Sequence, residues 1–187
     1  MTPKRIAIVG GSGAGKTTLG KQLAYLIDSV FVEVDALQHK ANWTKASADE
    51  ISSAIHAALT ETPRWVIDGT CEREVGDFIS RQADVIVWLD LPLAVKLARL
   101  LRRSWRRVRT QEVLWNGNVE TWRSVFVGRD SVVAHPLRTH FRHRRRMLMR
   151  TDQGKIVRLR SARAVDTWVA SLQLSRTVDE PNQADAG

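Results

Sequence analysis

Short apolar runs alternate with stretches of helical periodicity along most of the chain. The runs that resemble strands cover 4–9, 30–34, 65–68, 84–91 and 155–159. Between or after them, apolar residues recur every three or four positions over 16–27, 49–59, 93–108 and 164–172, which predicts helices, and an arginine-rich helix is expected at 136–150. Strands that alternate with helices in this way predict an α/β fold, with a parallel sheet covered by helices on both faces.

No linker or internal repeat divides this pattern, so a single domain is expected over residues 1–174. Residues 110–135 lack a clear period, and we expect a lid-like insertion of about 104–141 over the C-terminal edge of the sheet. Residues 175–187 are polar and are expected to form a disordered tail. The predicted architecture is a three-layer α/β/α fold around a parallel five-stranded sheet, with an arginine-rich lid.

Composition narrows the class of protein. The chain has 187 residues, of which 43% are hydrophobic, so it is long and apolar enough to fold around a core. No apolar run approaches the roughly 20 residues that span a bilayer, so no membrane partner is expected. The single cysteine, Cys71, cannot form an internal disulfide. A chain without disulfides is expected in the cytoplasm.

The net charge of +9 is concentrated in one region. Residues 99–163 hold 17 Arg and one Lys against four acids, a net charge of +14, whereas the rest of the chain carries −5. Arg99, Arg103 and Arg107 recur every four positions and are expected on one helix face. Such a cluster suits a compact polyanion, such as the phosphates of a nucleotide. A nucleic-acid patch and a solvated helix face are the alternatives.

Residues 10–17 read Gly-Gly-Ser-Gly-Ala-Gly-Lys-Thr and fit the phosphate-loop pattern G-x-x-x-x-G-K-[ST]. Glycine permits the close backbone approach and unusual dihedral angles that wrapping around a phosphate requires. Lys16 would reach the outer phosphates, and Thr17 would offer its hydroxyl to Mg²⁺. The expected strand before the loop and helix after it complete the context. The motif therefore predicts ATP and Mg²⁺ as ligands, bound by Gly11, Ser12, Gly13, Ala14, Gly15, Lys16, Thr17 and Thr18.

Acidic residues follow three of the predicted strands, at the edge where open parallel sheets bind ligands. Glu33 and Asp35 alternate on the second strand and are expected on one face. Asp35 would hold the water shell of the metal or accept a proton from an acceptor hydroxyl, and a solvated strand-end acid is the alternative. Asp68-Gly69 would cap a turn or let a substrate approach. Asp90 would act as a Walker B acid or cap the next helix.

Two further groups of residues carry weaker signals. The basic region contains His135, His140 and His143. Without a Cys or acid to complete a ligand set, surface or core roles are favoured over a metal site. Three tryptophans near predicted loops would either pack in the core or stack on a base: Trp43, Trp115 and Trp122.

With these residues described, the sequence resembles the adenylate-kinase-like group of P-loop kinases. Within that group it is most similar to the small bacterial proteins labelled DNA topology modulation proteins or adenylate kinase-like ATPases. The matching segments are IAIVGGSGAGKTTL (6–19), VEVDALQHKANW (32–43), WVIDGT (65–70), ADVIVWLDLP (83–92) and LWNGNVETW (114–122). The resemblance implies that Arg99 and Arg103 contact phosphates, because their spacing from Asp90-Leu91-Pro92 matches that of the family.

The resemblance weakens at the acceptor site. Asp68-Gly69 matches the AMP-site strand of adenylate kinases, but the Phe-Pro-Arg that follows it in the family is Thr70-Cys71-Glu72 here. Arg73 is the nearest arginine. This departure argues against AMP as the acceptor. We therefore expect a nucleoside or another hydroxylated acceptor rather than a nucleoside monophosphate.

Together these observations predict an ATP- and Mg²⁺-dependent kinase of the nucleoside or nucleotide type, which transfers the γ-phosphate to a small-molecule acceptor. The expected catalytic residues are Lys16, Asp35, Arg99 and Arg103, the expected metal-binding residues are Thr17 and Asp35, and the expected acceptor-binding residues are Asp35, Asp68, Gly69 and Arg73. One alternative is a P-loop ATPase or regulator that binds nucleic acid through its basic segment. Another is a nucleotide-binding module without turnover.

Overall fold

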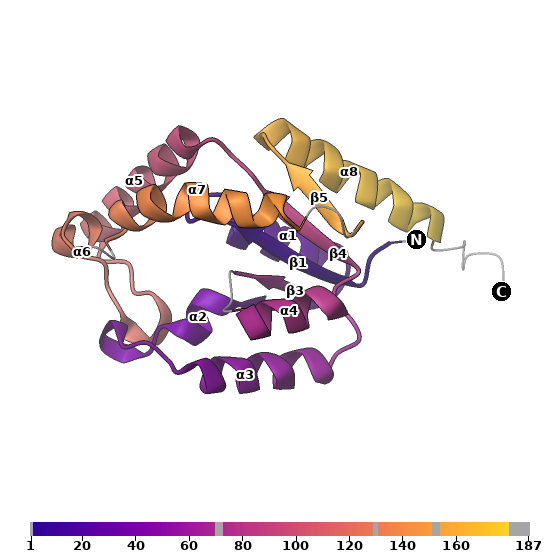
Figure 1. Ribbon diagram of the computed structural model, residues 1–187, viewed down its shortest axis with the longest axis horizontal. Coiled ribbons are helices and arrows are strands. Elements are labelled where there is room, and N and C mark those ends of the chain that lie inside the picture. The colour runs from indigo at the N-terminus through magenta and orange to yellow at the C-terminus, as the bar shows by residue number, and fades with distance from the viewer. Residues whose placement is uncertain (1, 70–72, 129–130, 151–153, 180–187) are drawn as a thin grey trace.

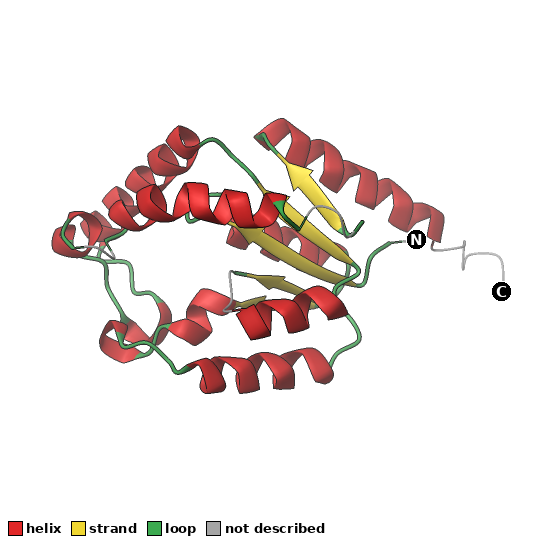
Figure 2. Cartoon of the chain, viewed as in Figure 1, coloured by secondary structure: helices red, strands yellow, loops and turns green. Residues whose placement is uncertain are grey.

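The computed structural model describes residues 2–69, 73–128, 131–150 and 154–179 of the chain. Five strands form one parallel sheet in the order β2-β3-β1-β4-β5 (Figure 1). The strands are β1 (Arg5–Gly10), β2 (Val30–Glu33), β3 (Trp65–Asp68), β4 (Val85–Leu89) and β5 (Ile156–Leu159). Every strand is followed in sequence by a helix (Figure 2), as parallel neighbours require. The predicted α/β fold with a parallel five-stranded sheet is confirmed.

Helices cover both faces of the sheet. The covering helices are α1 (Lys16–Leu26), α3 (Ala48–Thr60), α4 (Arg73–Gln82) and α8 (Ala162–Asp179). On one face, Leu23 of α1 and Val169 of α8 share a buried cluster with Ile8 of β1. On the other face, Ile55 of α3 and Ile79 of α4 belong to a second buried cluster. None of the described helices combines the length and the hydrophobicity needed to cross a membrane.

The strand register brings the carboxyl ends of β1, β2 and β3 together. Ile8 of β1 lies opposite Asp68 of β3, and Asp68 lies opposite Glu33 of β2. β1 lies between β3 and β4, so the strand order reverses around it. In open α/β sheets this reversal point is where ligands bind. The loop that follows Gly10 therefore starts at the centre of the binding edge.

The crossover from β4 to β5 places three further helices over that edge of the sheet (Figure 1). They are α5 (Leu93–Thr110), α6 (Trp122–Phe126) and α7 (Ala134–Leu148). α5 and α7 contact each other and carry most of the arginines of the cationic region. The segment expected to form a lid, about 104–141, corresponds to the end of α5, α6 and the first half of α7.

Three local predictions differ from the structure. β2 ends at Glu33, and the next residues form a short helix, α2 (Val34–Gln38). Helix α4 was not predicted, although Val75 and Ile79 in it have helical spacing and are buried. Helix α8 continues to Asp179, so residues 175–179 are helical rather than disordered, and Arg176 anchors this end by donating to the carbonyl of Leu26. Residues 180–187 of the expected tail lie outside the described residues.

Candidate active site

The phosphate loop joins β1 to α1 and its shape is set by the backbone. Gly13 has φ +78, and a Cβ there would lie 2.4 Å from the carbonyl oxygen of Lys96, so only glycine fits. Gly15 has φ +94 and is the N-cap of α1. The Ala14 N–H donates to the Gly11 carbonyl at 3.1 Å, which closes the turn. The glycine backbone and the N-terminus of an 11-residue helix together form a site for a phosphate anion.

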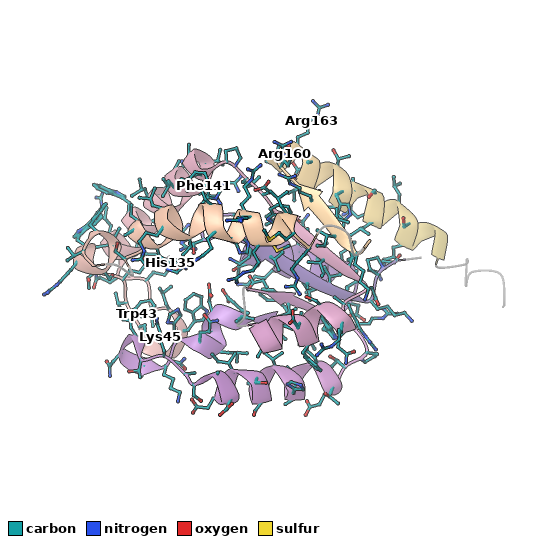
Figure 3. All side chains as sticks on the ribbon, in the orientation of Figure 1. Trp43, Lys45, His135, Phe141, Arg160 and Arg163 are labelled. Carbon is teal, nitrogen blue, oxygen red and sulfur yellow. The ribbon has the colours of Figure 1, made fainter. Side chains whose placement is uncertain are left out.

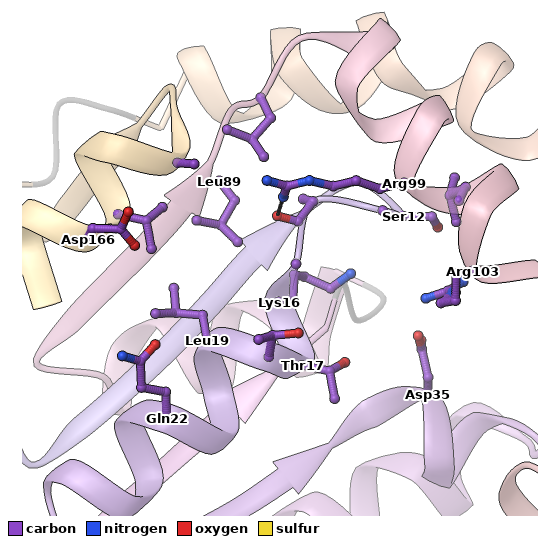
Figure 4. A pocket seen from close by; sticks show the side chains of 18 residues that line it. Ser12, Lys16, Thr17, Leu19, Gln22, Asp35, Leu89, Arg99, Arg103 and Asp166 are labelled. Carbon is purple, nitrogen blue, oxygen red and sulfur yellow. Dashed lines mark hydrogen bonds between the residues drawn. The ribbon is translucent and has the colours of Figure 1, made fainter. Parts of the chain in front are cut away.

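Two cavities open onto this loop. The smaller, about 440 Å³, extends from the loop to α5 and the start of α8 (Figure 4). The larger, about 1160 Å³, extends from the loop to α7 and to the segments that follow α2 and α5. The residues that line both cavities are Ser12, Lys16, Asp35, Leu100 and Arg103. These shared residues mark the place where the two cavities meet.

The four predicted catalytic residues line the smaller cavity (Figure 4). Lys16 extends from the first turn of α1, and Arg99 and Arg103 extend from α5 one turn apart. The Arg99 Nη1 donates to the carbonyl of Ala14 at 3.4 Å, so this arginine lies against the phosphate loop. Arg103 faces Asp35 across the cavity (Figure 4). Partial desolvation and the neighbouring charge of Arg107 lower the pKa of Arg103, so a bound anion would stabilise this guanidinium.

Acidic side chains gather beside Thr17, whose hydroxyl donates to Glu33 Oε1 at 3.2 Å. Asp68 lies opposite Glu33 in the sheet and is 1% exposed, and its Oδ2 has no hydrogen-bond partner among the described residues. Burial raises the pKa of Asp68 to about 6, and the charges of Glu33 and Asp35 add to the rise, while Thr17 and Lys16 oppose it. A divalent cation would stabilise such a crowded group of carboxylates.

The residues beside Thr17 suit Mg²⁺ better than a metal ion whose ligands all come from protein side chains. In the part of the chain that the structure describes, no three His, Cys, Asp or Glu side chains are placed to hold a metal together. Mg²⁺ does not need such a cage, because it keeps several waters and binds through one or two protein groups and the substrate phosphates. Thr17 and Glu33 provide such groups at the start of α1 and the end of β2.

The prediction that Glu33 and Asp35 alternate on one strand is wrong. The strand ends at Glu33, and Asp35 lies in the first turn of α2. Gly69 explains this turn, because its φ is +143 and a Cβ there would lie 2.5 Å from Cβ of Val34. Val34 is thus buried over the glycine, and the next residue faces the cavities. Asp35 consequently faces both cavities, and Glu33 is the carboxylate beside Thr17.

The predicted acceptor residues are only partly brought together. Asp35 lines both cavities, but neither Asp68 nor Gly69 is among the described residues that line them. Arg73 begins α4, and the structure does not describe its side chain. The segment Thr70-Cys71-Glu72 lies outside the described residues. The acceptor contact expected of Arg73 therefore stays a prediction.

Six arginines of the cationic region illustrate two different environments. In the first, Arg107 pairs with Glu120 at 2.8 Å, and Arg144 and Arg158 pair with Asp90 at 3.3 and 2.5 Å. Asp90 is therefore held in ion pairs and lines neither cavity, unlike a Walker B acid. The second group lines the larger cavity, as Arg107 also does, but the described residues provide no ion pair for its members: Arg103, Arg142 and Arg146.

Lys96 is a site residue that the sequence analysis missed. It is 3% exposed, its Nζ lies 2.7 Å from Nδ1 of His140, and a Cβ on Gly11 would lie 3.1 Å from the same Nζ. Burial and the charge of Lys16 lower the pKa of Lys96. The pKa of His143 is lowered to about 4, mainly by burial and then by the charges of Lys96 and Lys16. Both histidines therefore face a positive site beside the phosphate loop, and the Lys96–His140 contact joins α7 to α5.

Two loops of the same design close one side of the larger cavity. Residues 39–45 and residues 113–119 are each closed by a single antiparallel bridge between their first and last members. The fourth residue of each loop is an asparagine with positive φ, 58° for Asn42 and 55° for Asn116. Asparagine adopts this left-handed conformation more readily than most residues. We call the pair of loops, 39–45 and 113–119, the clasp.

Hydrogen bonds join the two loops of the clasp. Asn118 accepts from the Trp43 N–H at 2.8 Å through Oδ1 and donates to the Lys40 carbonyl at 2.9 Å through Nδ2. Asn116 donates to the His39 carbonyl at 2.5 Å. Asn118 is 3% exposed, so its two bonds to the opposite loop are partly shielded from water. Segments about 75 residues apart in the sequence thus form one continuous wall.

Aromatic rings of the clasp face the larger cavity. The ring of His39 stacks on Trp115 at 6.0 Å and meets the edge of Trp43 at 5.4 Å, and all three residues line the cavity. Figure 3 shows His135 of α7 facing the same opening as Trp43 from the opposite side. Trp122, by contrast, lies on α6 against Trp105 and Phe126 and lines neither cavity.

Comparison with known proteins places this geometry in a wider context. No family model matches the chain. A shikimate kinase of Halorhodospira halophila (strain DSM 244 / SL1) is 36% identical over 85 residues, which make up 46% of this chain and 37% of that protein. The match thus spans little more than a third of the relative.

Solved structures resemble the whole fold. A gluconokinase from Sinorhizobium meliloti 1021 matches with a TM-score of 0.52 and 17% identity over 96% of this chain and 98% of that chain. A shikimate kinase from Acinetobacter baumannii in complex with shikimate matches with a TM-score of 0.54 and 18% identity over 95% of each chain. The predicted resemblance to adenylate-kinase-like proteins is confirmed at the level of the fold, while the DNA topology modulation group stays a prediction. The chain has the P-loop kinase fold shared by shikimate kinases and gluconokinase.

Proposed function

We propose that the protein is an ATP-dependent kinase that transfers the γ-phosphoryl group to a hydroxyl of a small anionic acceptor. The observation that carries this proposal is the meeting of the two cavities at Lys16, Asp35 and Arg103. One cavity contains the phosphate loop, and the other is large enough for a second substrate. A cationic pair and a carboxylate at their junction are the groups that phosphoryl transfer requires.

In this proposal the smaller cavity binds ATP. The loop amides and Lys16 hold the β- and γ-phosphates, and Arg99 lies against the same loop. The base of ATP lies toward the start of α8, where Ala162, Val165 and Asp166 line the cavity. Thr17 and Glu33 would hold Mg²⁺, which would neutralise charge on the phosphate oxygens.

The larger cavity binds the acceptor. A hydroxyl at Asp35 attacks the γ-phosphorus, the bond from phosphorus to the β,γ-bridging oxygen breaks, and the hydroxyl proton passes to the carboxylate. Arg103 then lies opposite Asp35, where it stabilises the moving group. The carboxylate of Asp35 would repel a phosphate at this point but would accept a proton, which favours a hydroxyl acceptor.

The lining of the larger cavity supports an acceptor that carries negative charge. Arg142 and Arg146 line it, and helix α7, which carries them, contains no acid. The volume suits an acceptor the size of a nucleoside or its phosphate, the class implied by the resemblance to adenylate-kinase-like proteins. The names shikimate kinase and gluconokinase refer to smaller hydroxylated acceptors, which fall within the same proposal.

A screen for ADP formation tests the proposal. The protein is incubated with ATP and Mg²⁺ together with one compound at a time: nucleosides, nucleoside monophosphates, hydroxy acids and sugar phosphates. We expect at least one hydroxylated, anionic compound to raise ADP formation above the level without acceptor. ADP formation that responds to nucleic acid and to none of the small compounds would contradict the proposal.

A further inference from the structure

Glu33 receives two hydrogen bonds from distant parts of the chain. Thr17 of α1 donates to its Oε1 at 3.2 Å, and the indole N–H of Trp115 donates to its Oε2 at 3.2 Å. Each carboxylate oxygen therefore has one protein donor and keeps a lone pair free. Because the Thr17 hydroxyl donates its hydrogen bond to Glu33, the lone pairs of its oxygen remain available to a cation.

Trp115 reaches Glu33 only as part of the clasp. Its ring stacks on His39, and its carbonyl accepts from Nδ2 of Asn118 at 2.8 Å. Asn118 also bonds the opposite loop through Trp43 and Lys40. The position of the indole N–H is thus set by contacts between the two loops, which also form the wall of the larger cavity.

We propose that Trp115 is a positioning residue through which closure of the clasp over the acceptor cavity orients Glu33 in the metal site. The inference rests on the proposed function, because it takes Thr17 and Glu33 as groups that hold the Mg²⁺ of ATP. When the clasp is closed, Glu33 is fixed by two donors and directs the Thr17 hydroxyl. When the clasp opens, the indole leaves, and Glu33 loses the donor on its Oε2.

Such an arrangement couples two sites in both directions. If closure of the clasp strengthens binding of Mg²⁺-ATP, then Mg²⁺-ATP must strengthen closure of the clasp by the same factor. The metal thus favours a closed wall around the acceptor, and ATP without metal does not. The physical benefit is that the reacting phosphate is shielded from water only when it is correctly bound.

Binding of a fluorescent ATP analogue, mant-ATP, tests the proposal without any acceptor. Its dissociation constant is measured with Mg²⁺ and with EDTA for the wild type, Trp115→Phe, Glu33→Gln and Trp122→Phe. Phenylalanine at 115 keeps a ring against His39 but removes the donor. Trp122→Phe is the matched control, since Trp122 lies on α6 and lines neither cavity.

We expect the gain in affinity for mant-ATP that Mg²⁺ produces to fall by about tenfold in Trp115→Phe, because the variant loses one hydrogen bond to a charged group. Glu33→Gln should lose at least as much of this gain. The gain in Trp122→Phe should equal that of the wild type, and the affinities of the variants for mant-ATP in EDTA should stay unchanged. A full Mg²⁺ gain in Trp115→Phe beside a reduced one in Glu33→Gln would overturn the role of Trp115 alone. A wild type whose affinity for mant-ATP does not change with Mg²⁺ would overturn the proposed function and this inference together.

Hydrogen exchange tests the reverse direction. Amides in the clasp, including that of Trp43, should exchange more slowly with ATP and Mg²⁺ than with ATP and EDTA. In Glu33→Gln this difference should disappear. Equal slowing by Mg²⁺ in the wild type and in Glu33→Gln would show that the clasp closes without the contact to Glu33, and would overturn the coupling.

Discussion

The two cavities of the proposed active site, which we call the ATP half and the acceptor half, are built in different ways. The phosphate-binding part of the ATP half is made by one continuous segment, the phosphate loop and the first turn of α1, and its shape comes from glycine backbone and helix amides, while α5 and the start of α8 line the rest of the cavity. The acceptor half is made by side chains from α2, α5, α7 and the two loops of the clasp. Its cationic wall and its aromatic wall come from segments that are far apart in the sequence.

Because of this difference, one half of the cleft binds a ligand that many proteins share, ATP, and the other half selects a particular acceptor. Backbone groups in the ATP half recognise phosphate, which is the same in every nucleotide. The side chains of the acceptor half can change without disturbing the loop, because they lie on other elements. Substitutions at the junction should therefore affect turnover most, those in the ATP half should affect ATP, and those in the acceptor half should affect the acceptor alone.

The largest effect is expected at the junction, from Asp35→Asn. Loss of the proton acceptor should lower kcat by roughly 10²–10⁴-fold with the true acceptor, the usual contribution of a general base. Asp49→Asn, an exposed change on α3, is the control. If Asp35→Asn keeps near-normal turnover while Arg73→Ala loses it, the attacking group is a phosphate, and the assignment of a hydroxyl acceptor is wrong.

Lys16→Ala tests the ATP half. Removal of a charge aimed at the phosphates should lower kcat/KM by about 10²–10³-fold, or several kcal/mol of transition-state stabilisation. The fold should persist, because the side chain extends into the cavity. Lys21→Ala, on the exposed side of the same helix, should behave as the wild type. Unchanged ATP turnover in Lys16→Ala would rule out the phosphate loop as the ATP site.

Asp68, which lies beside the ATP half at the end of β3, gives the stability of the protein a dependence on pH. Its pKa is raised from 3.8 to about 6, so the folded protein binds the proton more tightly than the unfolded chain does. The free energy of unfolding that this group contributes therefore falls as pH rises from about 4 to about 6. Asp68→Asn removes this dependence on pH. The difference in the free energy of unfolding between the variant and the wild type should therefore shift in favour of the variant by up to about 3 kcal/mol between pH 4 and pH 7. Urea unfolding at both pH values measures it, and a pH-independent difference between the two proteins would contradict the assignment.

Arg142→Ala tests the acceptor half. The KM for the acceptor should rise about tenfold, the loss of one charge-assisted hydrogen bond, while the KM for ATP stays the same. Arg145→Ala is a close control, because Arg145 is exposed on the same helix and lines neither cavity. A parallel rise in the KM for ATP would mean that α7 serves both halves, and the comparison between them would fail.

The lid should respond to ATP even without an acceptor. We expect amide exchange over residues of about 104–141 to slow when an ATP analogue binds, because the cationic region resists compaction until phosphate is present. The change should be modest, since α5 and α7 already contact each other. Equal exchange with and without the analogue would contradict a lid.

The same difference between the two halves determines what could be predicted from the sequence. The phosphate loop was readable because its chemistry lies in eight consecutive residues. The order of strands and helices was also readable, since buried strands and amphipathic helices have different periods. Asp35 was assigned to a strand because nothing local shows that Val34 must pack over Gly69, which is 35 positions away.

The acceptor half was less accessible for the same reason. Lys96 lies on the buried face of α5 in line with Leu100 and Val108, and a lysine in that row is a signal that distinguishes it from the other basic residues of the helix. The clasp had a weaker signal, a tryptophan next to an asparagine in each loop, at Asn42-Trp43 and Trp115-Asn116. Its pairing depends on contacts between distant segments, which periodicity does not encode.

The most direct test follows the γ-phosphate itself. ATP labelled at the γ-position is incubated with the protein, Mg²⁺ and the compounds that raise ADP formation, and the products are separated. We predict that the label appears in an acid-stable phosphate ester of the acceptor, and that Asp35→Asn slows its appearance by roughly 10²-fold or more. Label that appears only in inorganic phosphate, with every compound tested, would contradict the claim that this cleft joins an ATP site to an acceptor site.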